Sequence, residues 1–210
     1  MDGTDTLDLW DYRRRVDHQY QEIRGAGLHE NSWRQWCQAR DELFGTHPQS
    51  PIPDSRRGDF SGLTYFSYDP AWRVTARLEA ASDEDQLIGH SGPGETGFRR
   101  VARVVFPREG RENSLDLFWL NGYGGGVFLP FRDQTNGSAT YGGGRYLLDT
   151  VKGADLGGPA RPGSFVCDFN FAYHPSCVHG AAWSCPLAPA ENRLGLAVEA
   201  GERLPPEPAP

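Results

Sequence analysis

Long hydrophobic runs are missing from this sequence of 210 residues. The longest, Val101 to Phe106, is interrupted by Arg103, whereas a membrane-spanning helix needs about 20 apolar residues. The first residues, Met1 to Asp5, are acidic and contain neither the basic nor the apolar region of a secretory signal. These absences lead us to expect a cytoplasmic protein that does not contact a membrane.

Excess positive charge is missing as well. Lys and Arg together number 21 against 28 Asp and Glu, so the net charge is −7. Binding to nucleic acid needs clustered basic residues, and we therefore expect no nucleic-acid partner. Lys152 is the one lysine. Its amine could form a Schiff base or transfer a proton, which arginine cannot do, but GC-rich codon usage explains the bias equally simply.

Familiar cofactor and catalytic motifs are absent too. The sequence has no dinucleotide-binding glycine fingerprint, no zinc-hydrolase motif and no serine nucleophile elbow. We therefore expect no cofactor. Cysteines number four, and in a reducing compartment they are expected to be thiols unless they hold a metal.

Two helices are predicted at the start of the chain. The first covers roughly residues 5–24, with an irregular apolar side formed by Trp10, Val16, Tyr20 and Ile23. The second begins at a capping box formed by Ser32 and Gln35 and ends at Gly45.

Alternation of apolar and polar residues predicts strands from residue 60 onward. The expected strands cover residues 72–79, 98–106, 115–120, 127–131, 146–148, 165–171 and 194–198. Long helical patterns between them are missing, so we predict a mainly β fold: an antiparallel β-barrel or sandwich with an N-terminal helical segment. Residues 1–204 are expected to form one globular domain, with a helical cap at about 5–45 and a β domain at about 58–204. The Pro-rich tail, 205–210, is expected to be disordered.

The predicted strand 165–171 carries the most informative polar residues. Asp168 and Asn170 lie two residues apart, so both would point to the same side of the strand. In a barrel interior they would share one cavity, where Asp168 could act as a base and Asn170 could orient a ligand carbonyl. On an outer face they would simply be solvated.

Four possible metal or thiol ligands follow within twelve residues: Cys177, Cys185, His174 and His179. Zinc sites use four such ligands, but the spacing matches neither a zinc knuckle nor a zinc ribbon. The other interpretations are a Cys177–Cys185 disulfide, a Cys177 nucleophile beside a histidine, or two packed thiols.

Arg145 follows a glycine-rich turn and could bind an anion or pair with Asp133 or Asp149.

Several blocks of the sequence together resemble the bacterial family DUF1684. They are the helix residues 36–44 and the segments at 131–147, 168–177 and 185–194. The resemblance covers nearly the whole chain and implies one globular domain with no settled activity. Its pattern singles out Thr140, Arg145, Tyr146, Asp168, Asn170, Tyr173, Cys177, Cys185 and Asn192. Family members usually have Asn at the position of His174 and Tyr at that of His179, which weakens the zinc and the Cys–His interpretations.

Together these features predict a protein that binds a small organic molecule and acts as a cofactor-independent acid–base enzyme, such as an isomerase, cyclase or hydrolase. Asp168 would be the base, Tyr173 or Tyr146 the acid, and Arg145 with Asn170 the orienting pair. The other expected substrate contacts are Thr140, Asn192, Cys177 and Trp183. The alternatives are a non-catalytic binding or structural module and, third, a Cys/His metal protein. We expect a monomer or homodimer.

Overall fold

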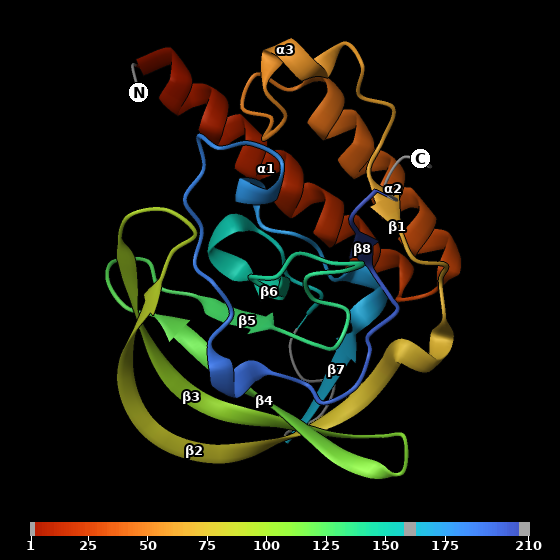
Figure 1. The fold of residues 1–210 in the computed structure, drawn as a ribbon, viewed down its shortest axis with the longest axis vertical. Helices are drawn as coiled ribbons and strands as arrows, with labels where there is room; N and C mark the ends of the chain where they lie inside the picture. The colour runs from red at the N-terminus through yellow and green to blue at the C-terminus, as the bar shows by residue number, and fades with distance from the viewer. Residues whose placement is uncertain (1–2, 158–162, 206–210) are drawn as a thin grey trace.

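The computed structural model describes residues 3–157 and 163–205 (Figure 1). The predicted disorder of the tail concerns residues 205–210, of which 206–210 lie outside the described residues. The helices are α1 (Gly3–Ala26), α2 (Glu30–Thr46) and α3 (Asp54–Arg57). The strands are β1 (Thr64–Tyr65), β2 (Arg73–Gly89), β3 (Glu95–Arg108), β4 (Arg111–Leu120), β5 (Val127–Phe131), β6 (Arg145–Asp149), β7 (Ser164–Asp168) and β8 (Glu202–Arg203). Short 3₁₀ turns are η1 (Pro70–Trp72), η2 (Thr150–Lys152), η3 (Phe169–Phe171), η4 (Ser176–Val178) and η5 (Ala190–Asn192).

Six strands form one antiparallel sheet in the order β6-β5-β4-β3-β2-β7. The long strands β2 and β3 curl it into a half-barrel (Figure 1). Register shifts between Ala80 and Glu84, and between Arg100 and Ala102, mark where these strands bend. Strands β6 and β7 end the strand order, so the described sheet is open. The predicted mainly β, antiparallel fold with an N-terminal helical segment is confirmed.

The concave face of the sheet holds the core. Alternate residues of β2 and β3 are buried, including Val74, Ala76, Val104 and Phe106. They pack with Leu115 of β4 and with residues of β5, β6 and β7 in one cluster. Period-two alternation therefore identified these strands because one face of the sheet is covered and the other is exposed.

Helices α1 and α2 lie together over one end of the half-barrel (Figure 1). Trp36 of α2 joins them to the core: its ring lies 6.4 Å from that of Tyr20 and 5.3 Å from that of Phe171. The predicted cap of α2 is wrong by three residues. The N-cap is His29, whose side chain accepts the Ser32 amide, and the Ser32 hydroxyl closes the box from position N3.

Three other local predictions need correction. Trp10, placed on the apolar side of the first helix, is 59% exposed. The strand predicted over 165–171 stops at Asp168, because that side chain caps the η3 turn by accepting the Asn170 amide. The segment 194–198 forms no strand; it runs along the loop that follows β5 through single backbone hydrogen bonds, such as that from Gln134 to Leu196.

None of the helices within residues 3–157 and 163–205 has the length and apolar character that crossing a bilayer requires. Strand β8 pairs with β1 and brings Glu202 against α2. This position of Glu202 matters for the site described next.

Candidate functional site

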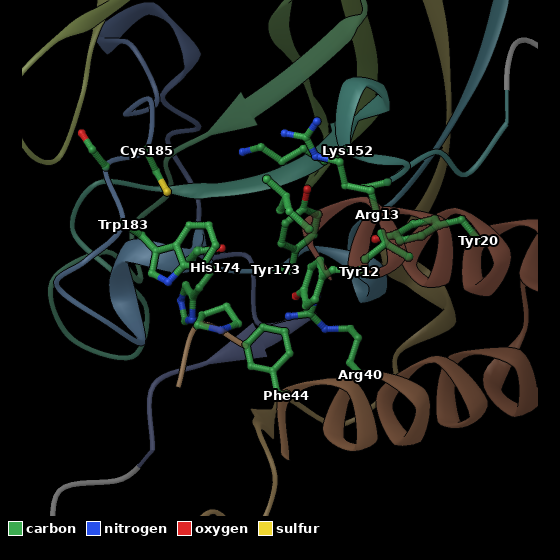
Figure 2. A pocket seen from close by; sticks show the side chains of 16 residues that line it. Tyr12, Arg13, Tyr20, Arg40, Phe44, Lys152, Tyr173, His174, Trp183 and Cys185 are labelled. Atoms are coloured by element: carbon green, nitrogen blue, oxygen red, sulfur yellow. The ribbon is translucent and has the colours of Figure 1, made fainter. Parts of the chain in front are cut away.

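A cavity of about 250 Å³ lies between the two long helices and the loop that follows β7 (Figure 2). Helix α1 supplies one wall with residues three or four apart, which share one face of a helix. The lining residues are Leu9, Tyr12, Arg13, Val16, Tyr20, Arg40, Phe44, Pro51, Lys152, Ala154, Tyr173, His174, Ser176, Trp183, Ser184 and Cys185. The cavity therefore joins the N-terminal helices to segments near the other end of the chain.

Charge on this lining is of one sign. Three of the residues, Arg13, Arg40 and Lys152, are basic, and within the described chain no Asp or Glu lines the cavity. In Figure 2, Arg13 and Lys152 lie on one side of the space and Arg40 on the other. Lys152 Nζ is 3.3 Å from Asp149 Oδ2, whereas Arg13 has no ion pair among the described residues. An acidic protein thus has a basic, aromatic-walled cavity.

Arg40 is a buried basic residue that lines the cavity. Its Nη2 donates to Glu202 Oε2 at 2.7 Å, and its Nε donates to the Tyr65 hydroxyl at 3.3 Å. Its guanidinium also lies 4.8 Å from the Trp36 ring centroid and 5.1 Å from that of Tyr173. These contacts hold a charged group in a buried position and fix the orientation of Tyr173 beside the cavity.

Glu202 connects Arg40 to two histidines. Its Oε1 lies 3.4 Å from His174 Nδ1 and 3.1 Å from His179 Nε2, while Oε2 accepts the His174 amide at 2.9 Å. Burial alone would raise the pKa of Glu202, but the Arg40 charge and the His174 contact hold that pKa well below its usual value. Glu202 is therefore ionised at neutral pH.

His174 lines the cavity as a neutral ring. Its Nε2 accepts the Tyr141 amide at 3.2 Å, so the proton is assigned to Nδ1, facing Glu202. Burial lowers the pKa of His174, although Glu202 opposes that shift. Because Nε2 accepts the Tyr141 amide and Nδ1 faces the Glu202 carboxylate, His174 positions the loop and is poorly placed to take a proton from a ligand.

The metal interpretation finds no support in the described residues, among which no group of three or more His, Cys, Asp and Glu side chains could hold an ion. His174 and His179 face Glu202, and Glu202 is already paired with Arg40. Cys177 and Cys185 are both free thiols.

The structure brings only part of the predicted site to the cavity. Tyr173 and Trp183 line it, as do Lys152 and, from the metal alternative, His174 and Cys185. The other predicted residues lie elsewhere: Asp168, Tyr146, Arg145, Asn170, Thr140, Asn192 and Cys177.

Asp168 and Asn170 bond to each other. Asp168 Oδ1 accepts Asn170 Nδ2 at 2.9 Å, and Asn170 in turn closes the turn at Asp69 through both its amide oxygen and nitrogen. Asp168 Oδ2 is buried without a hydrogen-bond partner in the described chain. Burial raises the pKa of Asp168. This pair joins the end of β7 to the turn before η1.

Arg145 is enclosed by the C-terminal segment. Its side chain has no exposed surface; it pairs with Asp133 at 2.9 Å and donates to the carbonyls of Val198, Ala200 and Glu202. Of the alternatives raised by its sequence position, the structure shows the ion pair with Asp133. Burial lowers the pKa of Arg145, and the charge of Asp133 opposes this shift.

The three remaining polar residues of the family pattern also bond within the protein. Thr140 Oγ1 lies 2.8 Å from Thr135 Oγ1 in a buried turn. Asn192 Nδ2 donates to the carbonyls of Asp116 and Pro130, which bridges β4 and β5 where they do not pair directly. The Tyr146 hydroxyl donates to the carbonyl of Pro186. Whether any of these residues contacts a ligand stays a prediction.

Sequence reasoning missed the helical side of the cavity. Tyr12 and Arg13 occupy the inner face of α1, and Arg40 and Phe44 occupy that of α2. The signal was present in the spacing of Leu9, Tyr12 and Val16. The predicted apolar side included Val16 and Tyr20 but took Trp10 instead of Leu9 and Tyr12.

Comparison with known proteins places the chain in a family. Residues 58–203 match the family described as "Protein of unknown function (DUF1684)". The chain belongs to this family. The solution structure of an uncharacterised protein from locus rrnAC0354 of Haloarcula marismortui is similar to it, with 34% sequence identity and a TM-score of 0.61. That match covers 83% of this chain and 93% of the other. No curated protein matches significantly.

Membership in DUF1684 confirms the resemblance drawn from the sequence. The matched range excludes α1 and α2, so the family pattern covers the half-barrel and the loops but not the helical wall of the cavity. Arg40, Phe44 and the α1 residues therefore lie outside the region that the DUF1684 match defines.

Proposed function

We propose that the cavity of this DUF1684 protein binds a small organic anion with an aromatic or apolar body. The observation that carries the proposal is the composition of the lining: aromatic rings and basic groups without a carboxylate within the described chain. Binding pockets combine apolar walls with a few placed polar groups, and a ligand carboxylate would be favoured by the two basic groups on one side.

The geometry suggests how such a ligand would lie. Its apolar body would pack between Trp183, Tyr173 and the α1 wall, and its anionic group would face Arg13 and Lys152 (Figure 2). The charge of Arg40 is neutralised by Glu202, so Arg40 contributes mainly the flat surface of its guanidinium group to the cavity wall. Of the predicted catalytic groups only Tyr173 lines the cavity. The proposal therefore concerns binding and includes no catalytic step.

The experiment uses two probes of the same shape, 1-naphthylacetate and the neutral 1-naphthylacetamide, titrated calorimetrically into the purified protein. We expect the acid to bind at least about tenfold more tightly, because one charge-assisted hydrogen bond contributes about 1.5–3 kcal/mol. Equal affinities, or no binding of the acid, would overturn the proposal.

Charge variants locate the anion. Lys152→Gln and Arg13→Gln should each weaken binding of the acid severalfold and leave the amide unaffected. Arg14→Gln is the matched control: it removes the same charge from α1, but Arg14 stacks on Trp10 outside the cavity. A loss of affinity in Arg14→Gln equal to that in Arg13→Gln would indicate attraction by overall charge and contradict the site.

A further inference from the structure

A second cavity, of about 210 Å³, adjoins the one described above. It lies beside the turn between β2 and β3, and the rings of Phe98 and Phe128, stacked 5.0 Å apart, form part of its wall. Lys152 and Ser184 line both cavities. The junction of the two spaces therefore carries a hydroxyl group and an amine.

Ser184 meets a histidine at this junction. Its Oγ lies 3.2 Å from Nδ1 of His90, although 94 positions separate the two residues in the chain. Ser184 is exposed and His90 is half-buried, so a ligand in either cavity can reach the hydroxyl. The same Oγ lies 3.3 Å from the carbonyl oxygen of Pro93, which is a second acceptor for the hydroxyl proton.

A further contact orients the His90 ring. Its Nε2 lies 2.7 Å from Thr96 Oγ1, on the neighbouring strand β3. With the ring proton on Nε2 and donated to Thr96, Nδ1 keeps a lone pair that accepts the Ser184 hydroxyl. A hydroxyl within hydrogen-bond reach of a base, with that base held by a third group, is the arrangement that activates a serine nucleophile.

The backbone holds the Ser184 loop against the turn between β2 and β3. The Ser91 amide donates to the Cys185 carbonyl at 2.9 Å, and the Cys185 amide donates to Ser91 Oγ at 3.1 Å. These bonds lie one residue from His90 and from Ser184, so they fix the spacing of the pair. Gly92 leaves the hydroxyl uncovered, because a Cβ there would lie 3.2 Å from Ser184 Oγ and crowd it.

We propose that Ser184 and His90 form a nucleophile–base pair that hydrolyses small carboxylic esters. The pair lies where two cavities meet, so the two parts of an ester can occupy one cavity each while the carbonyl group faces Ser184. This activity goes beyond the binding proposed above and does not require the first cavity to favour an anion.

Lys152 is the cation at the junction. Its Nζ pairs with Asp149 Oδ2 at 3.3 Å, and Asp149 lines the second cavity. Attack on an ester places negative charge on the carbonyl oxygen, and an ammonium group at that position stabilises it. The acid part of the ester would lie in the first cavity, which Arg13 also lines, and the alcohol part in the apolar second cavity.

Hydrolysis proceeds through an acyl-enzyme. The Ser184 oxygen attacks the carbonyl carbon while His90 Nδ1 takes the hydroxyl proton; the bond from that carbon to the ester oxygen then breaks, and the alcohol leaves with the proton from His90. Water next attacks the acyl carbon and gives a proton to His90. The bond to Ser184 breaks, the serine oxygen takes that proton back, and the carboxylic acid is released.

The first test incubates the wild-type protein with diisopropyl fluorophosphate, which reacts covalently with activated serine hydroxyls, and locates the adduct by peptide mass spectrometry. We expect the adduct on Ser184, and none when the protein is unfolded in urea before the reagent is added. Ser176 is the internal control, because it lines the first cavity on η4 but the histidine contact belongs to Ser184. Absence of a Ser184 adduct, or equal labelling of Ser176, would overturn the proposal.

The second test measures the hydrolysis of 4-nitrophenyl butyrate. Ser184→Ala and His90→Gln should each lower kcat/KM at least about 100-fold, because a general base contributes about 10²–10⁴-fold. Thr96→Val should lower kcat severalfold and leave KM unchanged, since it only frees the His90 ring. His18→Gln is the matched control, because His18 is exposed on α1 and lines neither cavity. Equal rates in Ser184→Ala and the wild type would contradict the assigned nucleophile.

The two proposals for this part of the molecule can fail separately. Labelling of Ser184 in a protein that does not bind 1-naphthylacetate would reject anion binding and retain hydrolysis. Binding of 1-naphthylacetate without labelling of Ser184 would reject hydrolysis alone. Because the labelling test uses the wild type, it decides between these outcomes even if a variant does not fold.

Discussion

Two buried arginines, Arg40 and Arg145, show how similar chemistry serves two different purposes in this protein. Each pairs with one carboxylate, Glu202 or Asp133, and each lies beside aromatic rings. Arg145 also donates from Nη1 and Nη2 to three backbone carbonyls of the C-terminal segment. Arg40 instead lines a cavity, and its carboxylate also meets two histidines.

This difference distinguishes Arg145, which holds the fold together, from Arg40, which lines the proposed binding site. The C-terminal segment forms little regular structure, and Arg145 supplies the contacts that a sheet would otherwise provide. Around Arg40, the protein leaves a cavity, and of the two basic groups opposite it Lys152 pairs with Asp149, whereas Arg13 has no ion pair among the described residues. A polar residue that is buried and bonded to backbone carbonyls indicates a structural role, whereas basic groups that line an aromatic cavity are the basis of the proposed ligand site.

The largest expected effect comes from breaking the enclosed pair. Arg145→Met should reduce the free energy of unfolding by about 4–5 kcal/mol, because it leaves the Asp133 carboxylate buried without its cation and frees three carbonyls. Urea denaturation measures the change. Any fraction that folds should bind 1-naphthylacetate as the wild type does. A stable variant with weakened binding would place Arg145 in the ligand site instead.

Glu202→Gln tests the second pair and should cost less, about 3 kcal/mol, because the amide oxygen can still accept from Arg40 and from the His174 amide. The variant also has a pH signature. The pKa of Glu202 is lowered in the folded state, so its contribution is complete above about pH 4.5 and is lost as the pH falls through the folded-state pKa.

His174 adds an earlier phase to the same acid transition. Because burial lowers its pKa from 6.5, the unfolded chain takes up a proton first, and stability starts to decline as the pH falls below about 6.5. Unfolding free energies of the wild type and Glu202→Gln, measured from pH 7 to pH 3.5, separate the phases. The variant should lack the steep loss below pH 4.5. Parallel curves for the two proteins would show that Glu202 does not cause the steep loss of stability below pH 4.5.

Much of the half-barrel could be predicted from the sequence, for a physical reason. The first part of β2 is covered on one face, so the buried Val74 and Ala76 alternate with exposed residues. The segment 194–198 also alternates, with Leu194, Leu196 and Val198 buried. It is not a strand, because its backbone groups bond singly to loops and to Arg145. Alternation reports burial on one side and does not report the hydrogen-bond partner.

The site was harder to predict, because polar residues of a family pattern are required for folding as well as for function. Asp168, Asn170 and Asn192 were selected for their chemistry, yet each bonds to nearby backbone. The cavity instead depends on α1 meeting the loop after β7, some 150 positions away in the chain. The spacing of residues within α1 or within the loop does not indicate that the two segments are in contact. Of the residues predicted to be catalytic or to bind substrate, only Tyr173 and Trp183, on the loop itself, line the cavity.

The smallest expected effect concerns Asp168. Unlike Asp133 and Glu202, this buried carboxylate has no charged partner in direct contact within the described chain. Asp168 is buried, its Oδ2 has no hydrogen-bond partner in the described chain, and burial raises its pKa. The folded state therefore holds its proton more tightly than the unfolded chain does, and the wild type loses stability as the pH rises from about 3.8 through the folded-state pKa. Asp168→Asn removes this loss.

The same change introduces an amide group that lacks an acceptor, so the two effects oppose each other and the net change at pH 7 should be within about 1 kcal/mol. Asp133→Asn is the matched control, because Asp133 is equally buried but is bonded to Arg145, and it should cost about 3 kcal/mol. Urea unfolding at pH 4 and pH 7 distinguishes the two. Asp168 does not line the cavity, so 1-naphthylacetate should bind Asp168→Asn as it binds the wild type. A stable Asp168→Asn protein that no longer binds the probe would return Asp168 to the site that the sequence assigned to it.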